Sequence, residues 1–354
     1  MEFGLSEEQK LLQDSLTRFL KEQVSLDHIR EVAAGESNDA MAWSGLSELG
    51  IPGLIIPESH GGVGLGMLDA VVVAEALGYH ITPGPFISTA VIAPTMLMAA
   101  GQTERLTDVA AGQYRIGVAL SEAIGSRLDA GISVTDGTAT GKALFALDSE
   151  ADSYLINGPD HSLYWVDAGD PGFSRKLLTT IDKTRTICEL QLNKASVQLV
   201  SADPGVLLAG IDAGRVIQAA DSLGAAQCML DQAVAYSLQR EQFNRVIASF
   251  QAVKHMCAEM ASQLEPCRSL VWYAGHAMAT ASDDARLTAC HAKAHLSEVA
   301  QFVARTSTEV HGGMGFTDLV GLHYWFKRIG ANRQLLGSPE LVREEAARAQ
   351  NLVA

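Results

Sequence analysis

The chain has 354 residues, enough to bury a sizeable core in two or three packed layers. Its composition, with 47% hydrophobic and 19% charged residues, is ordinary for a folded protein. Asp and Glu number 41 against 26 Lys and Arg, a net charge of −15. This balance argues against nucleic acid or an anionic membrane as the main partner, because both bind clustered cations.

The cysteines and the N-terminus bear on the compartment. Five scattered cysteines, without CxxC spacing, argue against a disulfide framework or a zinc site. The first residues lead straight into an acidic helix, so we expect no signal peptide. The apolar stretches are too short, or too broken by Gly and Pro, to span a bilayer. We therefore expect a cytoplasmic protein with reduced thiols, no metal and no membrane association.

Residues 1–113 are predicted to form a helical domain. Ser6-Glu7-Glu8-Gln9 is a capping-box pattern, in which the Ser6 hydroxyl and the Gln9 amide satisfy free N–H groups at a helix start. Apolar residues then follow on one helical face. Three further helices are predicted, over about residues 39–49, 68–77 and 88–100.

Residues 114–203 are predicted to form a β-domain. Short apolar runs there are bounded by Gly, Asp, Asn and Pro. The predicted strands cover residues 116–120, 143–147, 154–156, 163–166, 177–181 and 187–192. Regularly spaced short strands of this kind are typical of a small antiparallel sandwich or barrel.

Residues 204–354 return to long helices. Small residues at helical spacing between 216 and 239 allow close helix packing. Further helices are predicted over about residues 250–280, 282–309, 322–336 and 339–352. The predicted fold class is therefore α+β and mainly α, with a middle β-domain between two helical domains.

The loop that follows Gln239 is a candidate anion site. It contains Arg240 and Arg245, and the next helix starts near Ser249. A helix N-terminus beside arginines suits a pyrophosphate, because backbone N–H groups and guanidinium forks point at one anion. On physical grounds alone, an ordinary polar loop between helices is still the favoured interpretation.

The same loop, with Ile247, resembles the R-x-x-F-G…I…F/H-Q segment of acyl-CoA dehydrogenases, which are flavoenzymes. Asn244 stands in place of the glycine, and it is the side chain that best tolerates a left-handed backbone. In the family this segment binds the FAD pyrophosphate and adenosine of the neighbouring subunit. The resemblance therefore implies FAD contacts at Arg240, Gln242, Phe243 and Gln251.

A second motif, Glu309-Val310-His311-Gly312-Gly313-Met314-Gly315-Phe316, resembles the family's Q-x-x-G-G-x-G-F loop. A lone glycine-rich turn is more often only a turn, but in the family this loop lies against the same FAD tail, also from the neighbouring subunit. The resemblance implies FAD contacts at Gly312, Gly313 and Glu309. Glu309 replaces the glutamine, and a carboxylate there would be repelled by pyrophosphate.

The resemblance extends across nearly the whole chain. Residues 49–62 and 75–78 are similar to the family's N-terminal helical domain, and Asp182-Lys183-Thr184-Arg185 is similar to its D-x-T-R motif. It implies an acyl-CoA dehydrogenase fold with a β-sandwich or barrel in the middle and a C-terminal four-helix bundle that oligomerises. It further implies FAD as cofactor, α,β-dehydrogenation of an acyl-CoA thioester, and electron transfer to an electron-transfer flavoprotein.

The catalytic base departs from the family pattern. The reaction needs a base for the α-proton while a hydride leaves the β-carbon for the flavin. The family's glutamate in Y-E-G corresponds to Leu336, and the alternative glutamate in the central helix corresponds to Gly214, before the expected substrate-binding Arg215. Neither Leu336 nor Gly214 can take a proton. Three nearby carboxylates are weak substitutes, each more readily explained as structural: Asp212, Glu309 and Glu340.

The flavin contacts of the β-domain are also altered. The family's T-E-P-x-x-G-S-D loop corresponds to residues 121–127, which are one residue shorter and carry Arg127 for the aspartate. Its W-x-T strand corresponds to Leu144-Phe145-Ala146, where the methyl of Ala146 cannot donate the hydrogen bond that a hydroxyl would give to the flavin. The remaining expected FAD contacts are Ser121, Ser126 and Ser338.

These differences follow a pattern. Groups that act within one chain on the flavin ring and substrate are depleted, whereas groups that act on a neighbour's FAD tail are kept. Some bacterial acyl-CoA dehydrogenases for steroid side chains and dicarboxylic thioesters are heterotetramers of unlike homologous subunits, one of which bears the base. The chain resembles the base-less subunit. The alternatives are a self-sufficient homo-oligomeric dehydrogenase with a displaced carboxylate, and a flavin-free structural homologue.

Overall fold

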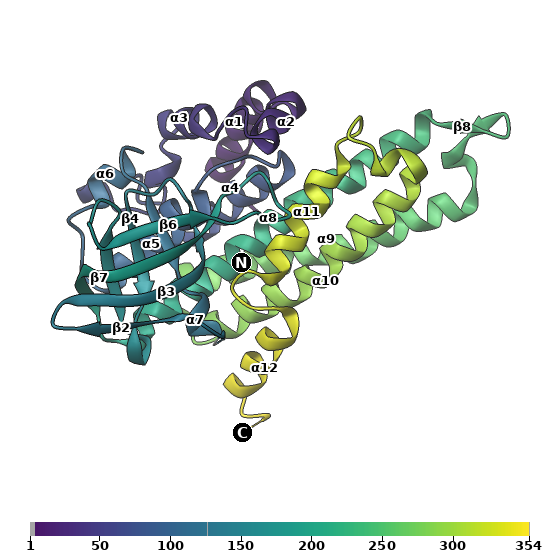
Figure 1. The fold of residues 1–354 in the computed structure, drawn as a ribbon. Coiled ribbons are helices and arrows are strands. Elements are labelled where there is room, and N and C mark those ends of the chain that lie inside the picture. The colour runs from purple at the N-terminus through teal and green to yellow at the C-terminus, as the bar shows by residue number, and fades with distance from the viewer. Residues whose placement is uncertain (1–3, 126, 354) are drawn as a thin grey trace.

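The structure, a computed structural model, describes residues 4–125 and 127–353. Figure 1 shows N-terminal helices above a β-barrel, and long C-terminal helices that run from the barrel to a small hairpin at the far tip. Among the described residues, no helix combines the length and the apolar character needed to cross a membrane. The expected α+β architecture, mainly helical with a middle β region, is confirmed.

The N-terminal helices begin at the predicted capping box. The Ser6 hydroxyl accepts a hydrogen bond from the Gln9 N–H, and the Gln9 side chain accepts one from the Ser6 N–H, at 3.2 and 3.0 Å. The α-helices are α1 (Glu7–Gln23), α2 (Leu26–Ala34), α3 (Ala40–Glu48), α4 (Met67–Tyr79), α5 (Ala93–Ala99) and α6 (Leu106–Ala110). Short helical turns are η1 (Ile51–Gly53), η2 (Glu58–His60) and η3 (Phe86–Ile92), the last being π-helical. The sequence pattern does not predict α2 and α6, and it joins η3 and α5 into one helix.

The middle region is a seven-stranded sheet in the order β2-β3-β1-β4-β5-β7-β6. Its strands are β1 (Ile116–Ala119), β2 (Gly131–Thr135), β3 (Thr138–Leu147), β4 (Ser153–Asn157), β5 (Leu163–Asp167), β6 (Phe173–Leu177) and β7 (Ile187–Ser201). β3 pairs with β7 as well as with β1, which closes the sheet into a barrel. β1 and β4 are parallel, so the expected antiparallel barrel contains one parallel pair.

One predicted strand is wrong. The apolar run 177–181 lies almost entirely outside the sheet, because β6 ends at Leu177 and the chain then turns toward β7. Leu177 and Ile181 are 61% and 59% exposed, so this run is not a buried strand. The sequence pattern also does not predict β2, and it predicts only the last residue of β6.

The C-terminal region consists of α8 (Pro204–Gln239), α9 (Gln251–Ala279), α10 (Ala285–His311), α11 (Leu322–Gln334) and α12 (Pro339–Ala349). Glycines bring α8 close to α4. A Cβ added at Gly224 would lie 1.8 Å from the carbonyl oxygen of Glu75, and one added at Gly78 would lie 2.0 Å from that of Asp221. The two helices therefore touch backbone to backbone, as the small residues predict.

A buried polar network joins the three regions. Arg185, in the D-x-T-R motif of the barrel, bonds to Asp182 at 3.0 Å and to Asn332 of α11 at 2.6 Å. Arg328 of α11 is 1% exposed and donates to the carbonyl oxygen of Thr82, which follows α4, and to Thr184 of the barrel motif, at 2.8 and 2.6 Å. Buried charges are tolerated only when they are paired in this way, so the network fixes how the regions dock.

We predict that Gly224→Ala destabilises the fold, because the new methyl has to displace the backbone of α4. The cost of overpacking is typically about 1–3 kcal/mol, larger than the gain in helix propensity. Urea unfolding monitored by circular dichroism measures this difference. Gly313→Ala is the control, because a Cβ there meets nothing within 4 Å and we expect a change within about 0.5 kcal/mol. Equal midpoints for the two variants would contradict the prediction.

Candidate functional site

The predicted anion-binding loop is a hairpin at the tip of the bundle. Strands β8 (Glu241–Gln242) and β9 (Arg245–Val246) pair antiparallel just after the end of α8. Phe243 and Asn244 between them have φ of 54° and 60°. Positive φ at both central residues matches the tight turn that joins twisted strands. The left-handed backbone at Asn244 is therefore confirmed, and it extends to Phe243.

The hairpin side chains are directed at solvent. Phe243 is 87% exposed, and the exposed side chain of Arg240 forms no hydrogen bond or ion pair with any residue that the structure describes. Arg245, by contrast, lies over the ring of Phe250 with its guanidinium carbon 4.0 Å from the ring centroid. Phe250 precedes α9 and offers no side-chain cap to the helix that starts at Gln251. The hairpin thus has an unpaired guanidinium at its start and leads into a helix whose first N–H groups have no side-chain cap.

The glycine motif lies at the same end of the bundle. It forms the turn η6 (Gly312–Phe316) after α10, and His311 stacks on Tyr236 of α8 with ring centroids 4.6 Å apart. Gly312 has φ of 59° and ψ of −138°, a conformation open in practice only to glycine. A Cβ added at Gly312 or Gly313 would meet nothing within 4 Å, so packing in this chain does not require glycine at either position. Glu309 is exposed beside them.

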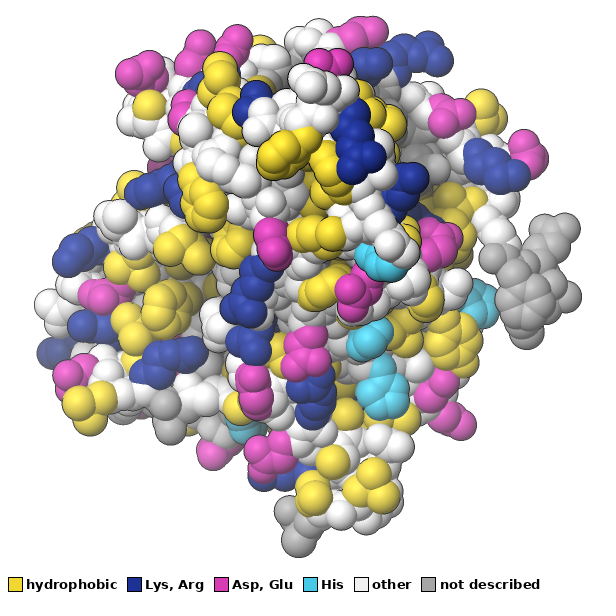
Figure 2. All heavy atoms as spheres, turned by 90° about the vertical axis from the view of Figure 1, so that its right-hand side faces the viewer, with side chains coloured by type: hydrophobic (Ala, Val, Ile, Leu, Met, Phe, Trp, Pro, Cys, Tyr) yellow, Lys and Arg dark blue, Asp and Glu magenta, His cyan; other side chains and the backbone are white. Residues whose placement is uncertain are grey.

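Exposed apolar side chains accompany the two motifs. Figure 2 views the molecule from this end and shows hydrophobic side chains interspersed with charged ones across the face. Phe316 and Leu319 are 79% and 75% exposed, and Leu238 at the end of α8 is 59% exposed. Figure 1 shows this tip at the opposite end of the molecule from the barrel. The hairpin and the barrel thus lie at different ends of the chain.

The two expected base positions face each other. A Cβ added at Gly214 on α8 would lie 2.4 Å from Cδ1 of Leu336 and 2.7 Å from Cδ1 of Ile92. Leu336 is 8% exposed and adopts a left-handed backbone, with φ of 57°. The structure thus brings together two positions that are separated by more than a hundred residues in the sequence. Hydrocarbon fills the space between them, and neither side can accept a proton.

Arg215, expected to contact substrate, is fully buried. Its two terminal nitrogens bond to both carboxylate oxygens of Glu345 on α12, at 2.7 and 2.8 Å, and its Nε donates to the carbonyl oxygen of Leu336 at 2.9 Å. Arg286 bridges Glu345 and Asp212, at 3.0 and 2.9 Å. No atom of Arg215 faces solvent, and these bonds hold it within the fold, while its expected substrate contact stays a prediction. No local sequence pattern predicts Glu345 as its partner.

The three candidate substitute carboxylates lie in different surroundings. Asp212 lies two positions from Gly214, so roughly 200° of helical rotation separates the two side chains. Burial raises the pKa of Asp212 to about 6, against the opposing charges of Arg286 and Arg215. Glu340 is exposed, and its own N–H at the helix start, together with Ser338 and Arg333, lowers its pKa to about 2, which makes it a weak base. Glu309 lies at the far tip of the bundle.

The barrel loop offers little to a flavin ring. Ser121 begins α7 (Ser121–Ile124) and is partly buried, as is Ser338 before α12, whereas Ser126 lies outside the described residues. Ala146 is fully buried, and it carries a methyl where the family resemblance leads us to expect a hydroxyl donor. Arg127 lies over the Phe145 ring, 5.1 Å from its centroid. The residues present therefore fit the anionic tail of FAD at the hairpin better than they fit its ring at the barrel.

Comparison with known proteins agrees with this fold. The profile described as acyl-CoA dehydrogenase, N-terminal domain, matches residues 6–108, and that for the C-terminal domain matches residues 205–350. The chain is 29% identical over 348 residues to the acyl-CoA dehydrogenase IpdE2 of Mycolicibacterium smegmatis, covering 98% of this chain and 99% of that protein.

Solved structures include assemblies of unlike subunits. A chain of the ChsE4–ChsE5 complex from Mycobacterium tuberculosis superposes with a TM-score of 0.90 at 25% identity, covering 100% of both chains. A chain of a Tcur3481–Tcur3483 steroid ACAD variant superposes with a TM-score of 0.88 at 27% identity, covering 98% of both.

Arg30 of α2 holds the segment that follows the glycine turn. Its Nε lies 3.2 Å from a carboxylate oxygen of Asp318, and its terminal Nη2 donates to the carbonyl oxygens of Asp318 and Leu319. Tyr324 donates to the other Asp318 oxygen at 3.1 Å. One guanidinium of the N-terminal region thus anchors the exit of the turn.

We predict that Arg30→Met loosens residues 312–320, because two backbone carbonyls and a carboxylate lose their common donor. Hydrogen–deuterium exchange read by mass spectrometry should show faster exchange in that segment and little change in the barrel. Arg18→Met is the matched control, since Arg18 is exposed on α1. Unchanged exchange at 312–320 in the Arg30 variant would refute this anchoring role.

Proposed function

The chain belongs to the acyl-CoA dehydrogenase family, and from that premise we propose that it is the base-less subunit of a hetero-oligomeric dehydrogenase. In this proposal it completes the FAD site of a homologous catalytic partner. The reaction is α,β-dehydrogenation of an acyl-CoA thioester, with electrons passing to an electron-transfer flavoprotein. The observation that carries the proposal is the hydrocarbon contact between Gly214 and Leu336 at both base positions.

The missing base assigns the proton-transfer step to the partner. Removing the α-proton of a thioester requires a positioned group that can bind a proton. Leu336 and Ile92 fill the space beside Gly214 where such a side chain would project, and Glu345 engages Arg215 nearby. The carboxylate that accepts the proton therefore belongs to the partner subunit.

The bundle tip gives the chain its own task. FAD supplies the hydride acceptor when it is bound. Arg240 provides an unpaired guanidinium for the pyrophosphate, and the uncapped start of α9 at Gln251 provides N–H groups for the same charge. Gly312 and Gly313 allow close backbone approach, while Gln242 and Phe243 lie within the exposed hairpin. This arrangement suits a neighbour's cofactor, because the chain's own barrel lies at the other end.

The named neighbours guide the choice of substrate and partner. One solved structure is named as a steroid ACAD and another as a complex of two proteins, ChsE4 and ChsE5. We therefore propose a hetero-oligomer and a steroid-derived acyl-CoA as the first combination to test. A homologous subunit with a glutamate at the position of Leu336 or of Gly214 is the partner that the chemistry requires.

We predict that the pure chain does not oxidise acyl-CoA and that the co-purified hetero-oligomer does. Arg240→Met in the hetero-oligomer should weaken FAD binding about 10- to 100-fold, because a charge-assisted hydrogen bond contributes about 1.5–3 kcal/mol. Fluorescence of FAD released on dilution measures the affinity. Arg18→Met, which removes an exposed charge on α1, should leave it unchanged.

Two results would overturn the proposal. One is normal turnover by the pure, flavin-loaded chain. In that case, measuring the Asp212→Asn, Glu309→Gln and Glu340→Gln variants would show which carboxylate acts as the displaced base. The other is the absence of a flavin absorption band both alone and with the partner, which identifies a flavin-free structural homologue.

A further inference from the structure

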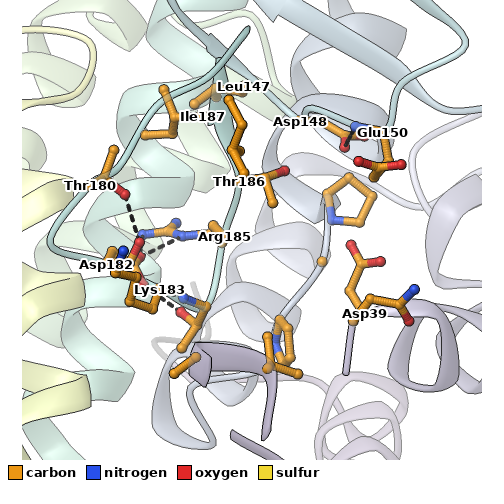
Figure 3. A pocket seen from close by; sticks show the side chains of 18 of the residues that line it. Asp39, Leu147, Asp148, Glu150, Thr180, Asp182, Lys183, Arg185, Thr186 and Ile187 are labelled. Carbon is orange, nitrogen blue, oxygen red and sulfur yellow. Dashed lines mark hydrogen bonds and ion pairs between the residues drawn. The ribbon is translucent and has the colours of Figure 1, made fainter. Parts of the chain in front are cut away.

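A cavity of about 530 Å³ lies where the N-terminal helices, the barrel and α11 meet (Figure 3). Its walls include the loop between α2 and α3, the segment 83–88, the loop 177–187 and Leu335. This volume is in the usual range for small-molecule sites. The cavity is separate from the barrel loop that begins at Ser121. Arg115, which lines the cavity, lies before the start of β1, whereas Ser121 lies after the end of β1 and does not line the cavity.

One end of the cavity is acidic. Arg115 bonds to both carboxylate oxygens of Asp39, at 3.1 and 2.8 Å, and to both of Asp148, at 2.9 and 2.8 Å. Two carboxylates thus share one guanidinium. Glu150 adds a third carboxylate, which is exposed and accepts only the neighbouring Ser149 hydroxyl among the described residues. Arg175, which does not line the cavity, lies near enough to Glu150 for their charges to interact, but forms no ion pair with it among the described residues. Three carboxylates thus face the cavity at this end beside a single lining guanidinium, that of Arg115.

The other end is basic. Arg185 pairs with Asp182 at 3.0 Å, so these two charges balance. Lys183 also lines the cavity, is exposed, and forms no hydrogen bond or ion pair within the described part of the chain. Figure 3 shows the Asp182–Lys183–Arg185 group on one side and Asp39, Asp148 and Glu150 on the other. Thr186 lies between the two groups, and Leu147 and Ile187 lie along the wall of the cavity beside it.

We infer that this cavity binds a zwitterionic small molecule of the ω-amino acid type. Its ammonium group pairs with Glu150, its carboxylate pairs with Lys183, and its methylene chain lies along Leu147 and Ile187. A carboxylate alone leaves Glu150 unpaired, and an amine alone leaves Lys183 unpaired. A pyrophosphate does not fit, because the guanidinium of Arg115 is already held by two carboxylates. The site does not depend on the proposed function.

Binding to the pure chain tests this inference with probes of matched length. By saturation-transfer NMR and calorimetry, ε-aminocaproate should bind about fivefold more tightly than caproate or hexylamine, since each exposed ion pair contributes up to that factor. A shorter zwitterion, γ-aminobutyrate, reports whether the spacing between the two charges matters and should bind more weakly. Equal affinity for all four probes overturns the inference.

Variants of two exposed residues test the two ends of the cavity one at a time. In Lys183→Met, ε-aminocaproate should bind no better than hexylamine, and in Glu150→Gln no better than caproate. Lys176→Met on β6 is the control, because Lys176 is exposed and does not line the cavity, and its affinities should equal those of the unaltered chain. Retention of the zwitterion's advantage in both cavity variants places the ligand elsewhere and overturns the site.

Discussion

The burial of paired charges between the barrel and α11 is the constraint on which the arrangement of this molecule depends. Arg328 and Asp182 are 1% and 3% exposed, and their attraction has to offset the loss of hydration of both groups. Removing either partner would leave an uncompensated charge in the interior. Burial tends to raise the pKa of Asp182, but Arg185, Arg328 and Thr184 hold it below its ordinary value. The network thereby fixes α11, and with α11 the position of Leu336 opposite Gly214.

Two arginines of the family motifs, Arg215 and Arg240, differ in their surroundings. Arg215 is buried and held by Glu345, so its charge is satisfied within the chain. Arg240 is exposed and has no partner among the described residues. An arginine that matches the family motif can therefore have either a partner within the chain or none, and the sequence alone does not distinguish these two cases. The charge of the first arginine is met by its ion pair within the chain, and the second is available to a ligand from outside the chain.

Local chemistry explains which parts of the fold were predictable. The Ser6 cap and the left-handed Asn244 depend on neighbouring residues, and both agree with the structure. The run 177–181 is apolar yet lies in an exposed loop beside a cavity, so composition alone misassigns it as a strand. The Arg215–Glu345 pair joins residues 130 positions apart, and no sequence spacing indicates it. The FAD contacts inferred from the family resemblance stay predictions.

The arrangement of the tip distinguishes the proposed subunit from its alternatives. A self-sufficient enzyme would need a free base beside its own flavin, yet Asp212 is held by Arg286 and points away from the Gly214–Leu336 contact. A flavin-free homologue has no use for an unpaired Arg240 or for the open backbone at Gly313, whereas Gly312 is explained by its own backbone conformation. Both features serve a ligand that approaches from outside. A site made of such features is completed only by a second subunit, and this is why we propose a partner that carries the base.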